Sequence, residues 1–361
     1  MKTLMVVAGT RPEIIKMAPV IRALQRSDIP FTFAHCGQHY DDDMSQRFIE
    51  ELALPKPDYN CKVKVCSQGE QTACIIRNME RLLKNVKPAI VLVEGDTNGV
   101  LATTIASVKL GIPVGHVEAG LRSFDLRMPE EHNRRLTDHA STYLFAPTKT
   151  AENNLKKESI WGKIHLTGNT VIDAVTQHAP VAEKNSKIME EIRFERFALA
   201  TAHRAENVDD PLILKNFMEA FMEAPIPIVY PIHPRTQKRL KQNRIYTKIK
   251  KSRNLQLLPP LGYLDFLMLM KKCEIILTDS GGIQEEATAP QIRKPVLVLR
   301  TSTERPEAVE AGFATVVGTE KQNILEAIKG TLDNQKELPT ESPFGRGDAA
   351  EQIVKIIEEN F

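Results

Sequence analysis

The sequence has little of what marks secreted, metal-binding or membrane proteins. Its five cysteines are an odd number and contain no C-x-x-C pair, so neither a disulfide framework nor a zinc site is expected. No apolar run approaches the ~18–20 residues that a membrane span needs. The short apolar run near the N-terminus is interrupted by Arg11-Pro12-Glu13, which argues against a signal peptide. These absences predict a cytoplasmic protein in a reducing setting.

An excess of one charge sign is also missing. Lys plus Arg number 48 against 46 for Asp plus Glu, and a net charge of +2 gives no field that would favour nucleic acid or an anionic membrane as partner. What is present is an ordinary globular composition, 42% hydrophobic and 26% charged. A chain of 361 residues is too long for one ordinary core. Two domains of roughly 150–200 residues are therefore expected.

Short apolar runs alternate with helical patterns along the chain. Leu4–Ala8, Ala89–Val93 and Ile112–Val117 each have the character of a buried strand, and a helical pattern follows the first two directly. This alternation predicts parallel sheets with right-handed crossovers and helices on both faces. The pattern weakens over residues 180–195 and restarts at Phe197–Thr201, so we place the domain change between residues 168 and 195.

Acidic side chains follow the predicted strands. Asp96 comes after the strand at 89–93, Glu118 after the strand at 112–117, and Glu130 stands at a Pro-Glu-Glu helix start. His203 follows the strand at 197–201. Ligands bind at the carboxyl ends of parallel strands, where these four groups would be acid–base candidates with separated pKa values. Taken singly, the acidic groups also fit a charged loop with a helix start, and the histidine fits a structural hydrogen-bonding role.

A phosphate site is predicted at Ser280-Gly281-Gly282, which follows an apolar strand and opens a helix. The stretch is neither G-x-G-x-x-G nor G-x-x-x-x-G-K-[ST], so a nicotinamide cofactor and a P-loop are not supported. Arg11, His233 and Arg305 would complete a diphosphate clamp through charge-assisted hydrogen bonds. Taken singly, each arginine is more often a solvated surface residue.

Eight motifs taken together carry a resemblance to a known family. They run in order from near residue 2 to the last helix: G-T-R-P-E-I-I-K, G-D-T, H-V-E-A-G-L-R, P-E-E-x-N-R, G-N-T-V-I-D, H-R-A-E-N, D-S-G-G-I-Q-E-E and T-E-R-P-E. The chain resembles the UDP-N-acetylglucosamine 2-epimerases of the non-hydrolysing bacterial and archaeal type.

The resemblance implies a glycosyltransferase-B-like α/β fold with two Rossmann-like domains, parallel sheets and a ligand cleft between them. Residues 1–168 would form the N-terminal domain with the catalytic carboxylates, and residues 169–346 the UDP-binding domain. A C-terminal helix at 347–361 would pack back on the first domain. The resemblance also implies a homodimer. The implied reaction is reversible C2 epimerisation of UDP-GlcNAc to UDP-ManNAc, without NAD or metal, supplying surface-polysaccharide precursors. It proceeds by anti elimination of UDP through bound 2-acetamidoglucal and re-addition.

Site residues follow from the matching motif positions. The implied catalytic set is Asp96, Glu118, Glu130 and His203. The implied phosphate contacts are Arg11, His233, Ser280, Gly281, Gly282 and Arg305. Glu286 would bind the ribose, Phe266 would lie at the uracil, and Lys16 and Arg134 match positions near the ligand.

The chain departs from the family pattern at several positions. The familiar H-R-R-E-N has Ala205 at its third position, Thr301 replaces an Asp, and Arg346 replaces the Asp of G-D-G. The activator site of some bacterial enzymes lies near Gln38-His39, but Asp41 and Glu70 stand where an amide and an Arg are expected, so shared allosteric activation is not expected.

Several alternatives stay open. H-R-A-E-N also occurs in relatives acting on UDP-2,3-diacetamido-uronates, so the sugar is not fixed. A hydrolysing variant would release ManNAc and UDP. A retaining glycosyltransferase of the same fold would need an acceptor, and a sugar-nucleotide sensor would need none of the carboxylates.

Overall fold

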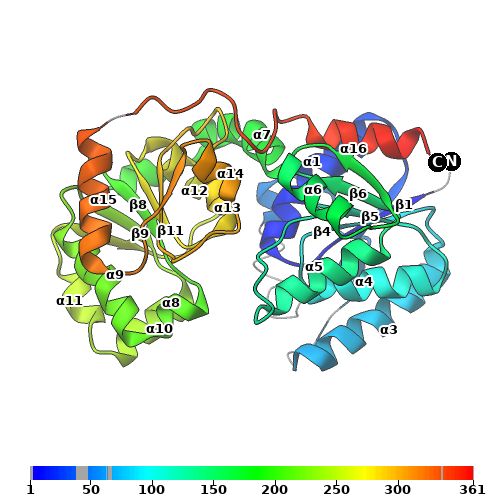
Figure 1. Cartoon of the computed structure of the whole chain (residues 1–361), viewed down its shortest axis with the longest axis horizontal. Helices are drawn as coiled ribbons and strands as arrows, with labels where there is room; N and C mark the ends of the chain where they lie inside the picture. The colour runs from blue at the N-terminus through cyan, green and yellow to red at the C-terminus, as the bar shows by residue number, and fades with distance from the viewer. Residues whose placement is uncertain (1–2, 38–47, 62, 64–66, 335, 361) are drawn as a thin grey trace. The chain divides into compact units, whose positions relative to one another are not determined.

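The computed structural model describes residues 3–37, 48–61, 63, 67–334 and 336–360. The chain forms two compact units. The first runs up to Ala174 and takes in the residues from Phe344 onward, and the second spans Val175–Pro343. Each unit is a parallel sheet covered by helices, as the alternating sequence pattern predicts (Figure 1). The prediction of two Rossmann-like α/β halves is confirmed.

The first unit contains a seven-stranded sheet of order β3-β2-β1-β4-β5-β6-β7, in which every pair is parallel. The strand order reverses between β1 and β4, which makes a switch point where ligands commonly bind. The strands are β1 (Leu4–Ala8), β2 (Phe31–His35), β3 (Tyr59–Asn60), β4 (Val91–Glu94), β5 (Val114–Val117), β6 (Tyr143–Ala146) and β7 (Lys163–Leu166).

Helices cover the sheet of the first unit because their apolar stripes need burial. They are α1 (Arg11–Arg26), α3 (Gln68–Val86), α4 (Asn98–Lys109), α5 (Pro129–Ala140), α6 (Lys149–Lys157), the start of α7 (Thr170–Asn185) and α16 (Ala349–Glu358). Every residue of β1, β4, β5 and β6 is buried, which explains why these strands are mostly apolar and do not alternate between apolar and polar residues. One predicted boundary was wrong, because the buried Glu94 belongs to β4 rather than to the loop after it.

The second unit contains a six-stranded parallel sheet of order β10-β9-β8-β11-β12-β13. Its strands are β8 (Ala198–Thr201), β9 (Ile228–Pro231), β10 (Leu255–Leu258), β11 (Ile276–Thr278), β12 (Val296–Val298) and β13 (Ala314–Val316). Its helices are the rest of α7, η2 (Ile188–Glu191), α8 (Ala205–Val208), α9 (Pro211–Glu223), α10 (Pro234–Gln242), α11 (Tyr246–Lys250), α12 (Tyr263–Lys272), α13 (Gly281–Glu286), α14 (Pro306–Glu310) and α15 (Lys321–Asp333).

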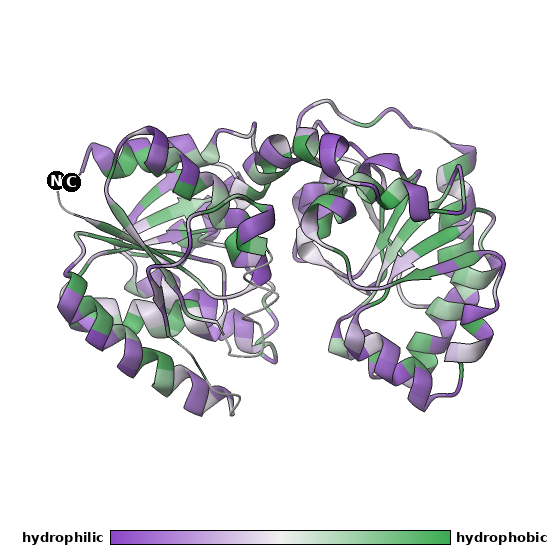
Figure 2. Ribbon diagram, turned by 180° about the vertical axis from the view of Figure 1, so that it is seen from behind, coloured by the Kyte–Doolittle hydropathy of each residue, from purple (hydrophilic) through white to green (hydrophobic). Residues whose placement is uncertain are grey.

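Hydropathy is distributed as expected for covered sheets. The strands in the middle of each sheet are largely hydrophobic, whereas the outer helices alternate hydrophobic and hydrophilic residues along their length (Figure 2). Across the described residues, no helix combines the length and the apolar character that crossing a bilayer requires. Within the same ranges, no three His, Cys, Asp or Glu side chains gather in a way that could hold a metal ion.

The chain passes from the first unit to the second inside α7, between Ala174 and Val175, rather than in a loop. Helix α16 returns to the first unit and packs on α1. The carboxylate of Asp173 caps α16 by accepting hydrogen bonds from the backbone amides of Ala349 (3.3 Å) and Ala350 (2.9 Å). Burial raises the pKa of Asp173 to about 6, although these hydrogen bonds act in the opposite direction.

Candidate active site

A pocket of about 340 Å³ opens at the carboxyl edge of the first sheet, at the switch point between β1 and β4. The ends of β1, β2 and β4 contribute to it, together with the first turns of α3, α4 and α5. Its lining comprises Gly9, Thr10, Cys36, Gly37, Gln68, Gln71, Ile75, Asp96, Thr97, Asn98, Gly99, Pro129, Glu130 and Asn133. This is the position at which the strand-end argument expects a ligand.

The turn from β1 into α1 is held by a buried carboxylate. Glu13 Oε2 accepts hydrogen bonds from the backbone amides of Gly9 (2.5 Å) and Thr10 (3.3 Å). Burial raises the pKa of Glu13, against the hydrogen bonds that lower it. A β-carbon on Gly37 would overlap the carbonyl oxygen of Gly9, so this part of the wall requires glycine. The guanidinium of Arg11 lies 4.5 Å from the centroid of the Phe48 ring.

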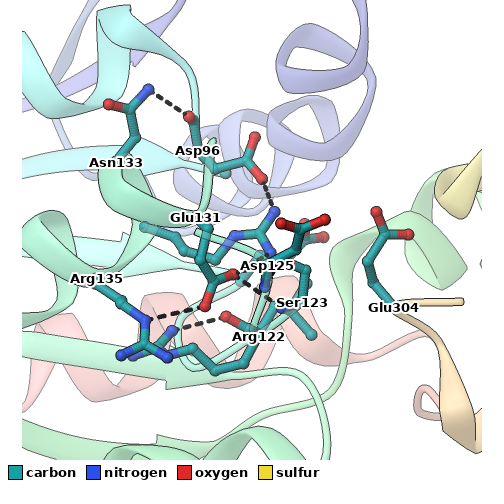
Figure 3. A network of polar contacts seen from close by, with 12 residues as sticks. Asp96, Arg122, Ser123, Asp125, Glu131, Asn133, Arg135 and Glu304 are labelled. Atoms are coloured by element: carbon teal, nitrogen blue, oxygen red, sulfur yellow. Dashed lines mark hydrogen bonds and ion pairs between the residues drawn. The ribbon is translucent and has the colours of Figure 1, made fainter. Parts of the chain in front are cut away.

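Two of the predicted catalytic residues, Asp96 and Glu130, line this pocket. The Asp96 carboxylate forms an ion pair with Arg134, and Asn133 Nδ2 donates to the Asp96 carbonyl oxygen at 2.9 Å (Figure 3). Asn133 Nδ2 also donates to Asn98 Oδ1 at 3.1 Å. One helix, α5, thus supplies both Glu130 and the side chains that hold Asp96 in place.

Glu131 differs from its neighbour Glu130, because it is fully buried and makes no wall of the pocket. Its Oε2 accepts hydrogen bonds from Ser123 N (2.8 Å), Ser123 Oγ (2.9 Å) and Arg134 Nη1 (3.0 Å), and its Oε1 accepts one from Arg135 Nε (2.9 Å) (Figure 3). Burial would raise the pKa of Glu131, but these contacts outweigh it and lower the pKa. Glu131 therefore anchors α5, a role that the sequence analysis missed.

Glu118 lies at the end of the neighbouring strand β5, where it forms an ion pair with Lys16. Its Oε2 accepts hydrogen bonds from Lys16 Nζ and, at 3.1 Å, from Asn169 Nδ2. The same Lys16 Nζ lies 3.3 Å from Oε1 of Glu94, another residue that the sequence analysis missed. The backbone of Glu118 has a φ of 68°, which is rare for a residue with a β-carbon. The carboxylate is thus held in place from α1 and from the segment before α7.

A buried His-Asp pair connects β5 to this edge. His116 Nδ1 lies 2.7 Å from Asp138 Oδ1, and His116 Nε2 lies 2.8 Å from the carbonyl oxygen of Gly95. Arg122 Nη1 lies 2.7 Å from Asp138 Oδ2. Burial would raise the pKa of Asp138, but the contacts with His116 and Arg122 lower it. This network fixes the turn that carries Asp96.

In the second unit, Asp279 organises the loop that carries His203. It accepts hydrogen bonds from the backbone amides of His203 (3.1 Å) and Arg204 (3.0 Å) and from Asn207 Nδ2 (3.1 Å). His203 Nδ1 lies 3.3 Å from Asp279 Oδ1, and the rings of His203 and His233 are 5.8 Å apart. The two predicted histidines therefore stand together at the carboxyl edge of the second sheet.

The predicted phosphate stretch lies at the same edge, where Ser280 is the N-cap of α13 and Gly281 begins it. A β-carbon on Gly281 would lie 3.5 Å from the guanidinium carbon of Arg305, and Arg305 itself forms an ion pair with Glu285. Gly282 and Glu286 lie on α13, and Phe266 is buried on α12. The strand-end residues predicted in this unit are thus brought together, and Phe266 and Glu286 come from the adjoining helices.

Glu304 is a further carboxylate in this region that the sequence analysis missed. It lies 2.6 Å from Arg300 Nη1 and 3.1 Å from Arg204 Nη2. Burial would raise the pKa of Glu304, but Arg204, Arg305 and Arg300 outweigh burial and lower the pKa to about 2. The positive charges at this edge are thus already partly neutralised from within the protein.

Of the positions considered for an allosteric activator site, Gln38, His39 and Asp41 lie outside the described residues. Glu70 is exposed and forms a capping box at the start of α3, where its Oε2 accepts a hydrogen bond from Ser67 N at 3.0 Å. The helix start thus explains this carboxylate without a ligand.

The family model described as UDP-N-acetylglucosamine 2-epimerase matches residues 22–358. The UDP-N-acetylglucosamine 2-epimerase of Methanocaldococcus jannaschii is 46% identical over 363 residues, covering 98% of this chain and 98% of that protein. The UDP-2,3-diacetamido-2,3-dideoxy-D-glucuronate 2-epimerase of Pseudomonas aeruginosa is 37% identical over 362 residues, covering 98% of this chain and 99% of that protein.

Solved structures give the same result. The crystal structure of the M. jannaschii UDP-GlcNAc 2-epimerase in complex with UDP-GlcNAc and UDP has a TM-score of 0.90 and 45% identity, with 99% of each chain covered. The predicted glycosyltransferase-B-like fold class is confirmed, and so is the resemblance drawn from the eight motifs. The chain belongs to the UDP-N-acetylglucosamine 2-epimerase family.

Proposed function

We propose that this protein is an epimerase that reversibly interconverts UDP-GlcNAc and UDP-ManNAc by inversion at C2 of the sugar. The observation that carries the proposal is the placement of Asp96 and Glu130 in one pocket at the sheet switch point, with Glu118 at the next strand end. The M. jannaschii relative with 45% identity is described as bound to UDP-GlcNAc and UDP, which supports the substrate class.

The proposed route is an anti elimination followed by re-addition. A base removes the proton at C2 while the electron pair of that C–H bond forms the C1–C2 double bond and the C1–O bond to UDP breaks. UDP and 2-acetamidoglucal remain bound. UDP then adds back to C1, and an acid delivers a proton to the opposite face of C2. Asp96, Glu118, Glu130 and His203 are the proposed acid–base groups, with the assignment of base and acid left to experiment.

The leaving diphosphate needs cationic and hydrogen-bonding partners, since negative charge concentrates on it as the C1–O bond breaks. The proposed contacts are Arg11 of the first unit and His233, Ser280, Gly281, Gly282 and Arg305 of the second. Lys16 and Arg134 are proposed to lie near the ligand. Glu286 is proposed to bind the ribose and Phe266 to contact the uracil. The route uses neither NAD nor a metal ion.

The test is proton NMR of the protein with UDP-GlcNAc alone in D₂O, without acceptor or cofactor. We expect UDP-ManNAc to form and deuterium to enter C2 of both epimers. Turnover without exchange at C2 would exclude the elimination route. Accumulating free ManNAc would identify the hydrolysing variant instead.

A second candidate is C2 epimerisation of a UDP-2,3-diacetamido-uronate. It is favoured by H-R-A-E-N at 203–207 and by the 37% identity to the P. aeruginosa enzyme named for that reaction. Comparison of kcat/KM for the two sugar nucleotides distinguishes the candidates, and a preference of at least about tenfold, which corresponds to ~1.4 kcal/mol, would assign the substrate.

We further propose a homodimer, as the resemblance implies. The exposed apolar side chains of Phe124, Leu126 and Leu136, on α5 and the loop before it, are consistent with a covered surface. Light scattering of the purified protein would show twice the chain mass if the proposal holds, and the chain mass of 40.5 kDa if it does not.

A further inference from the structure

Two carboxylates share one ammonium beneath the carboxyl edge of the first sheet. Lys16 Nζ forms an ion pair with Glu118 and lies 3.3 Å from Glu94 Oε1. The side chains of Lys16, Glu118 and Glu94 are only 9%, 8% and 2% exposed. Charges this far from water act on one another strongly, because little solvent screens them. The three groups must therefore be considered as one electrostatic unit.

Burying Glu94 at this position is expected to lower the stability of the folded protein. It ends β4, where its neighbours on the strand are apolar and buried, and its Oε1 faces Lys16 without an aligned hydrogen bond. A buried ionisable group that lacks full hydrogen bonding lowers stability. A single carboxylate would suffice to neutralise Lys16, so packing alone does not account for the second one.

The charged groups that act on Glu94 come from each element packed against it. From α1 they are Lys16 and Glu13, and after β5 there is Glu118. His116 is on β5 too, but its ring is engaged with Asp138 and the Gly95 carbonyl. Burial raises the pKa of Glu94 well above its usual range; Lys16 lowers it, and Glu118 and Glu13 raise it further. Glu94 and Glu118 therefore compete for protons as a coupled pair.

We propose that Glu94 is a positioning residue that serves as the counter-ion of Lys16 while Glu118 exchanges a proton with the sugar. The inference rests on the proposed role of Glu118 in C2 epimerisation. The proton moves only between C2 and a carboxylate oxygen of Glu118. When Glu118 is protonated, Glu94 remains beside the ammonium. Above the raised pKa of Glu94, where both carboxylates are ionised, the charge of Glu94 opposes that of Lys16 and keeps Glu118 basic enough to accept a proton from carbon.

The test is the Glu94→Gln variant of the full chain, which removes the charge and keeps the shape. Lys16 would then act on Glu118 without opposition, and the proton affinity of Glu118 would fall. We expect the pH limb of kcat/KM that depends on Glu118 to move to lower pH by about one unit or more. The direction is the same whether Glu118 acts as base or as acid.

Two further variants make the result specific. Glu94→Asp keeps the charge and should return the limb towards its wild-type position. Asp173→Asn also removes a carboxylate buried in the first unit, but at the cap of α16, and should leave the limb in place. The proposal is overturned if Glu94→Gln leaves the pH limb of kcat/KM in place. It is also overturned if Glu94→Gln shifts that limb no further than Asp173→Asn does.

If Glu94→Gln does not fold, the coupling can be tested by titrating the carboxyl ¹³C NMR resonances of the wild-type protein against pH. Glu118→Gln serves to assign the resonance of Glu118. Two shared titration steps for Glu94 and Glu118 support the coupling, and two independent single steps contradict it. Glu118→Gln also separates this inference from the proposed function. If that variant retains exchange at C2, the proposed role of Glu118 fails and this inference fails with it, whereas a wild-type protein without exchange at C2 would remove the proposed function itself. An inactive Glu118→Gln variant together with an unmoved Glu94→Gln profile removes only the role of Glu94.

Discussion

Asn169 Nδ2 donates a hydrogen bond to Glu118 Oε2 at 3.1 Å, and the backbone amide of the same asparagine donates to the carbonyl oxygen of Phe344 at 2.7 Å. Phe344 is the first residue of the chain's return into the first unit, and Asn169 directly precedes α7, by which the chain leaves it. One residue, through its side chain and its backbone amide, therefore connects the carboxylate of Glu118 to both segments by which the chain crosses between the units.

We expect Asn169→Ala to lower kcat for epimerisation about tenfold with little change in KM, because Glu118 loses a hydrogen bond worth roughly 1–2 kcal/mol to a charged group. Steady-state kinetics provide the measurement. Asn154→Ala is the matched control, since Asn154 Nδ2 donates to the carbonyl oxygen of Gly120 at 3.0 Å instead of to a carboxylate. Equal losses in the two variants would refute a specific role for Asn169.

Glu130 and Glu131 offer a comparison between adjacent residues of one type. Glu130→Gln should lower kcat by at least about 100-fold, as expected for an acid–base group, while thermal stability stays near wild type. Glu131→Gln should instead lower the free energy of unfolding by about 2–4 kcal/mol, because it breaks a buried network with Arg134, Arg135 and Ser123. Urea unfolding and turnover, measured on both variants, check the contrast. It fails if Glu131→Gln is stable and Glu130→Gln is active.

Glu304 should make the second unit sensitive to acid. Its pKa of about 2 in the folded protein lies below the usual 4.5, so its contribution is fully present above pH 4.5 and is lost as pH falls from 4.5 towards 2. At pH 7 we expect Glu304→Gln to lower the free energy of unfolding by about 3 kcal/mol. Urea unfolding at a series of pH values should show the difference from wild type shrinking below pH 4.5. A difference that is independent of pH would contradict this assignment.

Arg11→Ala is expected to raise KM and lower kcat, since a diphosphate contact acts both before and during cleavage of the C1–O bond. Arg127→Ala is the control, because Arg127 is 91% exposed and paired with Asp125. The measurement is initial rate against UDP-GlcNAc concentration. If kcat is unchanged in Arg11→Ala, Arg11 contributes only to ground-state binding.

The sequence pattern predicted the site residues that follow the strands better than the buried residues beneath them. Asp96 could be predicted because it follows an apolar run, and ligands gather where parallel strands end. Glu94 could not, because an acidic residue normally marks the end of such a run, and its burial depends on Lys16, which is distant in sequence. Glu130 and Glu131 are alike in sequence, and only the rotation of α5 against β4 and β5 decides which one faces the pocket.

Several elements were not predicted for related reasons. Strand β13 has only three residues and is partly exposed, so it has no uninterrupted apolar run. Helix α10 is rich in Lys and Arg, with few buried positions. Asp279 directly follows β11, and its side chain turns back to accept a hydrogen bond from the backbone amide of His203. That contact joins residues more than 70 positions apart and has no local signature.

At Glu118 the residue that the left-handed backbone favours differs from the residue that the proposed reaction needs. Glycine would adopt the φ of 68° without steric cost, and residues with a β-carbon lose roughly 1 kcal/mol there. With Glu94 still beside Lys16, the ammonium would retain an anion even without Glu118. Glu118→Gly is therefore expected to raise the melting temperature while abolishing turnover, so selection for thermal stability alone would remove the proposed acid–base group.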